Sequence, residues 1–263
     1  MQTTIDGLVL RAKAFEENRI LTILTAQQGL VTAFANKAGN ARKGLAASTE
    51  ALSYSRFVLF SHRGRTVADK ADANRIFFGI RQDYGKLCLA SYFAQLAGEL
   101  LAAAEPAPEP LRLLLNCLHY LEEGSREPHL LKPLFELRLL TLTGFMPDLV
   151  GCRFCGLHQA DEMRFFPQEG DIACGQCLTQ NSPPGGIVLS ASTLAAMRYI
   201  IYSPVERLFS FTLAQPGLDA LSRISEQYLL SKAERSFPAL ELYRSISQTA
   251  PSKSPADIRG CRQ

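Results

Sequence analysis

The chain has 263 residues with a hydrophobic fraction of 47%, and its formal net charge at pH 7 is +3. This length and apolar content allow a sizeable buried core and two domains, which excludes a disordered chain, while a charge of +3 alone does not identify a nucleic-acid-binding protein. The sequence has no N-terminal charged segment followed by an apolar run and no stretch of about eighteen uncharged apolar residues, so we expect a cytoplasmic protein without membrane contact.

Positive charge is concentrated towards the N-terminus. Residues 1–75 contain eleven Lys or Arg and six Asp or Glu, a net charge of +5, which leaves −2 for the remainder. The distribution of charge says more about partners than its sum does. The first third of the chain is therefore the basic part.

Alternation of apolar and polar residues, with turn-forming residues between the runs, predicts five short strands in this basic part. They lie at about residues 8–14, 19–25, 30–35, 52–60 and 66–68. An open sheet of this size would leave two unpaired edges, so we expect the strands to close into a small barrel. An OB-fold fits this number of strands. The sequence thus predicts an α+β protein that begins with a five-stranded OB-fold barrel at residues 1–78.

A polar, glycine-rich loop joins the third and fourth predicted strands. Lys37, Arg42 and Lys43 lie in it with no acidic residue among them, which suits the phosphates of a nucleic-acid backbone. From charge alone, a solvated surface loop is an equally good interpretation. Tyr54 and Phe57 could stack on bases, although aromatic residues of strands belong more often to the core. The candidate DNA-binding residues are Lys37, Arg42, Lys43, Arg56, Arg63 and Arg65.

Between about residues 71 and 83 the apolar period changes from two to 3.6 residues, which indicates a domain boundary. Helices are predicted at about residues 85–104, 111–124, 129–143, 190–203 and 218–235. The third is apolar on more than one face, so we expect it in the middle of a helical bundle that spans residues 79–245. Gly144 would cap its end, and Ser190 would cap the start of the fourth helix. Residues 246–263 lose the apolar period and are expected to be a disordered tail.

Two cysteine pairs with CxxC spacing lie between the third and fourth predicted helices. They are Cys152 with Cys155 and Cys174 with Cys177. Each tight turn directs two thiolates at one ion, and two such pairs complete a tetrahedral sulfur shell for zinc. Four cysteines close the coordination sphere, so we expect one structural Zn²⁺ rather than a catalytic ion. Four unbridged core thiols and a redox pair are the alternatives, but neither accounts for two matched pairs.

The residues around the cysteines fit a zinc loop at residues 150–180. Gly156 follows the first pair and Gly175 lies inside the second, where such turns need backbone freedom. Because four cysteines are present, His158 is expected to be a solvated loop residue. The loop is too polar and interrupted to hold itself, so the metal would substitute for a core and fix the third helix relative to the fourth.

Residues suited to catalysis are scarce in this sequence. The histidines are scattered and lack carboxylates at matching spacing; they are His62, His119, His129 and His158. No HxxEH pair, acidic cluster for a second metal, Ser/His/Asp arrangement or Walker loop is present. We therefore expect a protein that is not an enzyme.

The basic barrel, the helical bundle and the cysteine pairs together resemble the bacterial RecO family of recombination mediators, over roughly residues 5–240. The local resemblance lies in Leu10-Arg-Ala-Lys-Ala-Phe, Leu24-Thr-Ala-Gln-Gln-Gly, the loop that begins at Lys37, Leu134-Phe-Glu-Leu-Arg-Leu-Leu and the two CxxC pairs. The helix that begins at Leu134 is the more specific part, because many folds share CxxC pairs.

The resemblance implies a protein of DNA repair and homologous recombination in the RecF pathway. Such a protein binds single- and double-stranded DNA, anneals complementary strands and, with RecR, helps to load RecA onto DNA coated by single-strand-binding protein. It would contact the C-terminal tail of that protein and lie in the cytoplasm with the nucleoid. In the family the barrel and its loop contribute to DNA binding, which implies this role for Lys37, Arg42 and Lys43. Asn40 departs from the Gly-Ala-Arg-Arg-like run that is usual in the family.

A second function, from another class, is a zinc-stabilised protein-interaction scaffold that does not bind DNA. In that case the helical bundle would bind partners, and the basic face of the barrel would only be solvated. Arg126, Lys132 and Arg138 of the bundle are expected on a solvated face rather than on a second binding surface. Charge reversal at Arg42 and Lys43 distinguishes the two functions, because DNA binding that is insensitive to it favours the scaffold.

Overall fold

The computed structural model describes residues 2–36, 45–62, 64–181 and 185–249. Five strands near the N-terminus form a closed barrel, in the order β1-β2-β3-β5-β4 and back to β1. They are β1 (Gln2–Phe15), β2 (Asn18–Thr25), β3 (Gly29–Ala35), β4 (Ser53–His62) and β5 (Arg65–Ile76). Only β3 and β5 pair in parallel, over a short stretch, and the other pairs are antiparallel. The predicted five-stranded barrel is confirmed, although β1 and β5 are longer than the apolar alternation indicated.

The interior of the barrel is filled by side chains that point inward at alternate strand positions. Val9, Leu21 and Ile23 are wholly buried there, as is Phe57, whose possible role in base stacking is thereby excluded. A short helix, α1 (Leu45–Ser48), precedes β4 and contributes Leu45 to the same core. This alternation, with period two, is the pattern from which the strands were predicted.

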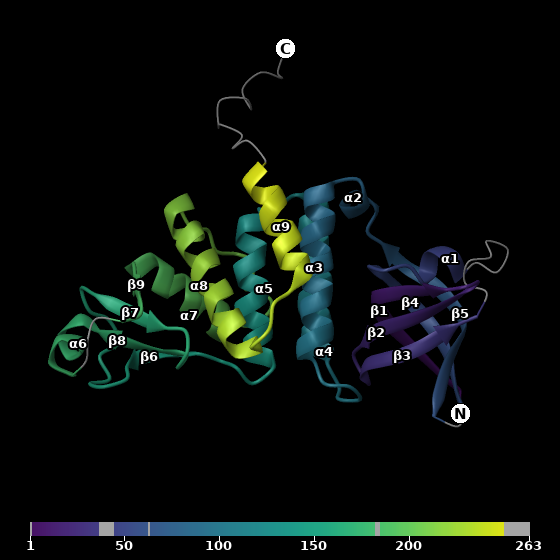
Figure 1. Ribbon diagram of the computed structural model, residues 1–263, viewed down its shortest axis with the longest axis horizontal. Coiled ribbons are helices and arrows are strands. Elements are labelled where there is room, and N and C mark those ends of the chain that lie inside the picture. Colours follow the sequence, from purple (N-terminus) through teal and green to yellow (C-terminus); the bar gives the residue numbers. More distant parts are fainter. Residues whose placement is uncertain (1, 37–44, 63, 182–184, 250–263) are drawn as a thin grey trace, which may run out of the picture.

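The helices form a layer between the barrel and a small sheet, as Figure 1 shows. They are α2 (Phe78–Arg81), α3 (Tyr84–Leu100), α4 (Pro108–Glu123), α5 (Pro128–Leu142), α7 (Ala191–Tyr202), α8 (Gln215–Ala233) and α9 (Pro238–Thr249). Ser190 caps α7 by accepting a hydrogen bond from the amide of Thr193, and Gly144, at φ +89°, follows the end of α5. Helix α9 was not predicted. Its last four residues, 246–249, were expected to begin a disordered tail and are helical instead. Residues 250–263 of that tail lie outside the described residues.

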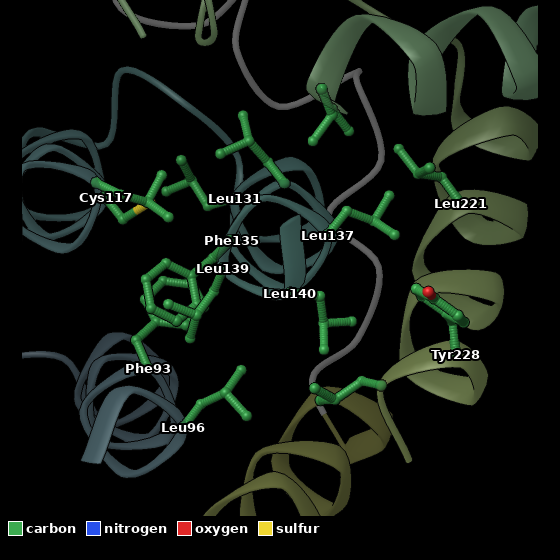
Figure 2. Close-up of a cluster of buried hydrophobic side chains, with 14 of the residues drawn as sticks. Phe93, Leu96, Cys117, Leu131, Phe135, Leu137, Leu139, Leu140, Leu221 and Tyr228 are labelled. Carbon is green, nitrogen blue, oxygen red and sulfur yellow. The ribbon is translucent and has the colours of Figure 1, made fainter. Parts of the chain in front are cut away.

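Helix α5 lies in the middle of the bundle, as its apolar pattern predicted. Ten of its residues are buried. In Figure 2, Phe135 and Leu139 face the neighbouring helices α3 and α4, while Leu137 lies towards α8. The rings of Phe93 and Phe135 pack with their centroids 4.4 Å apart. A helix that is apolar all round is stable only when other helices cover every side of it.

The segment that follows α5 folds into a small four-stranded sheet in the order β6-β8-β7-β9. Its elements are β6 (Asp148–Cys152), β7 (Met163–Phe166), β8 (Asp171–Cys174), α6 (Gly175–Asn181) and β9 (Ile187–Leu189). Phe165, Ile172 and Ala173 are wholly buried and belong to the same apolar cluster as the helices. The segment therefore packs on the core of the helices, which corrects the expectation that it is too polar to be held without the metal. The sequence hid the strands because each is only three to five residues long.

The barrel and the bundle pack on each other through one continuous apolar cluster. Leu8, Leu10 and Leu24 of the barrel lie in the cluster that also contains the buried face of α3. Polar contacts add to this packing, because Arg75 pairs with Glu122 of α4 at 3.0 Å. The orientation of the barrel is thus set by buried surface as well as by its connection to α2.

Gly29, in the turn between β2 and β3, allows the barrel to touch the connection between α3 and α4. Its φ is +58°, and a Cβ atom placed on it would lie 2.1 Å from the carbonyl oxygen of Glu105. The neighbouring amide of Ala107 donates a hydrogen bond to the carbonyl of Ala26 at 3.0 Å. Only a residue without a side chain permits this approach of two backbones.

We predict that Gly29→Ala lowers the free energy of unfolding by at least about 2 kcal/mol more than Gly144→Ala does. Both glycines have positive φ, but a Cβ atom on Gly144 would meet nothing within 4 Å, so that variant carries only the conformational cost. Urea unfolding followed by circular dichroism measures the difference. Equal destabilisation by the two substitutions would show that the backbone approach at Gly29 contributes nothing.

Candidate metal centre and nucleic-acid interface

The four predicted cysteine ligands are brought together by the small sheet. Cys152 ends β6 and Cys174 ends β8, and these two strands are neighbours. Cys155 lies in the turn after β6, and Cys177 lies in α6, directly after β8. All four sulfur atoms lie within 4.8 Å of one another.

The spacing of the sulfur atoms is close to that of a tetrahedral site. A metal–sulfur bond of about 2.3 Å gives a tetrahedron with edges of about 3.8 Å. The Sγ atoms of Cys155 and Cys174 are 3.8 Å apart. Cys152 and Cys174 are buried, whereas Cys155 is exposed, so the cluster lies at the edge of the sheet. The four cysteines could therefore hold a metal ion.

The turn after β6 is shaped by glycine and by amide hydrogen bonds. Gly156 has φ +75°, as the sequence predicted for this turn, and its amide donates to the carbonyl of Cys152 at 2.7 Å. The amide of Cys174 donates to the sulfur of Cys152 at 3.3 Å. Burial opposes ionisation of Cys152, but hydrogen bonds from the amides of Cys174, Cys155 and Phe154 outweigh it and lower the pKa of Cys152 to about 6. The thiolate is the form that binds a metal.

His158 is an exposed loop residue outside the cysteine cluster, as the sequence predicted, and both of its ring nitrogens have partners. Its Nδ1 lies 2.7 Å from the carbonyl oxygen of Val150, an arrangement in which Nδ1 carries the proton. Its Nε2 then accepts from Arg198 at 3.0 Å. His158 thus connects the first cysteine turn to α7.

Arg198 holds the small sheet against α7, a role that the sequence analysis missed. Its guanidinium group donates to the carbonyl of Leu149 at 2.7 Å and to the carbonyl of His158 at 2.6 Å. Desolvation by burial lowers the pKa of Arg198 from its ordinary value. The sequence could have indicated this role, because Arg198 is the single charged residue in the apolar run of α7 and a charge in such a helix needs partners.

The candidate DNA-binding residues divide into described and undescribed positions. Lys37, Arg42, Lys43 and Arg63 lie outside the described residues. Arg56 donates two hydrogen bonds to the carboxylate of Asp6, at 2.8 and 3.1 Å. Arg56 is exposed, but Asp6 already compensates its charge, and its contact with DNA stays a prediction.

Arg65 stands apart from Arg56 on the barrel. Its guanidinium group lies over the ring of Phe34, 4.2 Å from the centroid. Arg65 lies opposite His62 in the β4–β5 ladder. His62 is six residues along β4 from Arg56, which places the backbones of the two arginines about 20 Å apart. The structure does not bring these two arginines together. Tyr54 is partly buried and packs against the core shared with the helices.

Lys132 does not lie on the solvated face that the sequence suggested. Its ammonium group is almost wholly buried and pairs with Glu136 at 2.9 Å and with Glu226 at 2.8 Å. Arg244 of α9 pairs with the same Glu226. Glu136 also accepts hydrogen bonds from Tyr92 at 2.7 Å and from Ser225 at 2.5 Å. Two positive and two negative groups thus join α5 to α8 and α9, and the hydroxyl of Tyr92 adds α3.

Arg138 is also engaged within the bundle, which corrects the expectation of a solvated face. Its guanidinium group donates to the carbonyl oxygens of Ile201 at 2.6 Å and of Ile200 at 3.3 Å. These carbonyls belong to the last turn of α7, where the helix dipole favours a positive charge. Lys132 and Arg138 therefore stabilise the bundle and are not available to a ligand, while Arg126 is half-buried.

We predict that Glu136→Gln lowers the free energy of unfolding by about 3 kcal/mol, because it removes one of the two carboxylates that balance the buried Lys132. Glu99→Gln is the matched control, since Glu99 pairs with Arg235 at an exposed position and should cost no more than about 1 kcal/mol. Urea unfolding at neutral pH compares the two variants. Similar costs for both would show that burial does not strengthen the network.

The same network should make stability depend on acid. Burial opposes ionisation of Glu226, but Lys132 and Arg244 outweigh this and lower the pKa of Glu226 below its ordinary value of 4.5. Its contribution is complete above pH 4.5 and is lost as the pH falls through the lowered pKa. The stability gap between wild type and a Glu226→Gln variant should therefore close in acid.

Comparisons with known proteins place the chain among DNA repair proteins. Residues 1–73 match the family model described as Recombination protein O N terminal, and residues 81–241 match the one described as Recombination protein O C terminal. Three similar proteins carry the name DNA repair protein RecO. The protein of Acetivibrio thermocellus is 29% identical over 92% of this chain and 96% of its own length. The others, from Symbiobacterium thermophilum and Anaeromyxobacter sp. strain K, are 31% and 32% identical over 90% and 86% of this chain and 94% and 91% of their own.

Among the helices of the described residues, none combines the length and the apolar character that crossing a membrane requires.

Proposed function

The chain belongs to the RecO family, and on that premise we propose that it is a recombination mediator that acts directly on DNA. It would bind single- and double-stranded DNA, anneal complementary strands and, with RecR, help to load RecA onto DNA coated by single-strand-binding protein. The C-terminal tail of that protein would be a further partner. We place this activity at the nucleoid in the cytoplasm, within the RecF pathway. The observation that carries the proposal is that both family models match, in order, a closed five-stranded barrel and a helical bundle.

We assign DNA binding to the barrel, with the basic loop as its main contact. Closed five-stranded barrels bind single strands through a positively charged surface and aromatic stacking. Lys37, Arg42 and Lys43 supply the charge by sequence, and Arg65 on Phe34 supplies a cation beside an aromatic ring. Arg56 should contribute little, because Asp6 already compensates its charge. The barrel face that packs on α3 is covered and cannot take part.

The DNA assignment is tested by the salt dependence of binding to a fluorescent single strand. Alanine at Lys37, Arg42 and Lys43 should reduce the slope of the logarithm of the binding constant against the logarithm of the salt concentration. The expected reduction is about two units, at roughly 0.7 per lost phosphate contact. The matched control has alanine at Arg112, Arg207 and Arg223, which are exposed on the bundle and remove the same charge. Its slope should stay unchanged, as should that of Arg56→Ala.

Three outcomes would contradict the assignment. An equal change of slope in both triple variants would mean that net charge, rather than the barrel loop, governs binding. Unchanged slope and affinity in the barrel variant would move the DNA site to the helical domain, whereas no measurable binding by the wild type would favour the alternative function, a zinc-stabilised scaffold that binds proteins and not DNA.

We also propose that the four cysteines hold one structural Zn²⁺. The donor set supports this, because four thiolates fill the coordination sphere and leave no position for a substrate or a water. It is the only group of three or more potential metal ligands in the part of the chain that the structure describes. The role that we propose is therefore not enzymatic. The ion would join the ends of β6 and β8, and Arg198 already holds β6 against α7.

We predict that Cys155→Ser and removal of zinc by a chelator each lower the melting temperature, and that their effects do not add. Cys155 is exposed, so its substitution loses little packing and reports on the metal alone. Hydrogen exchange should show lost protection in the small sheet, while the barrel at the opposite end of the molecule keeps its protection (Figure 1). If Cys155→Ser destabilises the chelated protein as much as the untreated one, the ion is not the cause.

A further inference from the structure

A groove lies where α3 ends, α4 begins and α5 ends. Its volume is about 530 Å³, larger than the volume near the cysteine cluster. Leu100, Leu101 and Leu142 provide apolar surface, and each is partly buried against the main core. The opposite wall is the proline-rich connection at residues 102–110. Neither the metal centre nor the proposed DNA surface includes this groove.

The proline-rich wall is held in place before any ligand arrives. Ala103 forms β-bridges with Gly29 and Leu30 of the barrel, and the amide of Ala107 donates to the carbonyl of Ala26 at 3.0 Å. Proline also restricts the backbone of this wall. A segment that binds here therefore meets a preformed surface and does not have to order the wall itself.

The groove is electronegative as well as apolar. Glu105 and Glu109 line it and are exposed, and neither forms an ion pair within the described residues. The C-terminal ends of α3 and α5 converge at the same place, and neither helix has a basic residue in its last turn. The N-terminus of α4 adds a partial positive charge there, which Glu109 in its first turn offsets. The C-terminus of a helix carries a partial negative charge. This potential repels nucleic acids and acidic peptides and attracts a cation.

We propose that this groove is a docking site for a segment of a partner protein in which lysine or arginine stands beside large apolar residues. The apolar stem of such a cation would lie along Leu101 and Leu142, while its charge reaches Glu105, Glu109 and the two helix ends. Phe145 and Met146, which follow α5, are 41% and 53% exposed and extend the apolar surface beyond Thr143. The proposal does not depend on the proposed binding of DNA by the barrel.

The test measures binding of a fluorescein-labelled peptide of leucine, alanine and lysine to the full chain by fluorescence anisotropy. Glu105→Gln combined with Glu109→Gln should weaken this binding about tenfold, as expected for the loss of two surface charge contacts. Glu16→Gln combined with Glu17→Gln is the matched control, because these exposed residues lie at the far turn of the barrel. That variant loses the same charge and should bind as the wild type does.

A second variant separates shape from charge. Ala102 is exposed on the groove wall, so Ala102→Trp should fill the groove and weaken the peptide without changing the net charge. A peptide with glutamate in place of lysine should not bind measurably to any variant. All of the substituted residues are exposed, so each variant should fold as the wild type does. Circular dichroism checks this.

Three results would overturn the proposal. Equal binding of the lysine and glutamate peptides would exclude recognition of a cation. Equal weakening by the two glutamine pairs would reduce the effect to general charge attraction. Markedly tighter binding by a chain that ends at Thr249 would identify the occupant as the basic segment with Lys253, Arg259 and Arg262, and not as a partner protein.

Discussion

The burial of α5 on every side is the constraint on which the rest of the structure depends. A helix without a solvated face requires α3, α4, α7 and α8 around it, and this requirement fixes the bundle (Figure 2). It also explains the two charges in the middle of the helix. Lys132 and Glu136 can be buried only because Glu226, Tyr92 and Ser225 complete their contacts. The polar network therefore selects one arrangement of α3, α8 and α9 among the many that apolar packing alone would allow.

The small sheet after α5 is held by three different kinds of interaction. Its buried side joins the main core through Phe165 and Ile172. The carbonyls of β6 bind Arg198 of α7. The ends of β6 and β8 and the turns after them carry the four sulfur atoms, where a bound ion would replace packing that the short strands cannot supply. The loss of any one of them leaves the other two, so the sheet does not rest on the metal alone.

Features with a local cause could be predicted from the sequence, and features with a distant partner could not. The barrel strands, the central position of α5, the cap at Ser190 and the meeting of the cysteines all follow from patterns within a few residues. Whether a charged side chain is solvated or paired could not be predicted in this way. Lys132 looks like a surface cation because Glu226, which compensates it, lies far away in the chain. Helix α9 was missed although the sequence offered a local signal, because Leu240, Tyr243 and Ile246 recur at the spacing of an amphipathic helix.

The packing of α9 on α3 also sets an order for folding during synthesis. All strands of the barrel come from the first 76 residues, so the barrel can close while most of the chain is still being made. Helix α3 follows directly, but Phe237, which covers the ring of Tyr92, is more than a hundred residues away. Until α9 has left the ribosome, one apolar face of α3 is uncovered. The carboxylate of Glu226 also lacks its ion pair with Arg244. The nascent bundle is thus open to aggregation and to chaperones from the synthesis of α3 until that of α9, whereas the interior of the barrel is protected early.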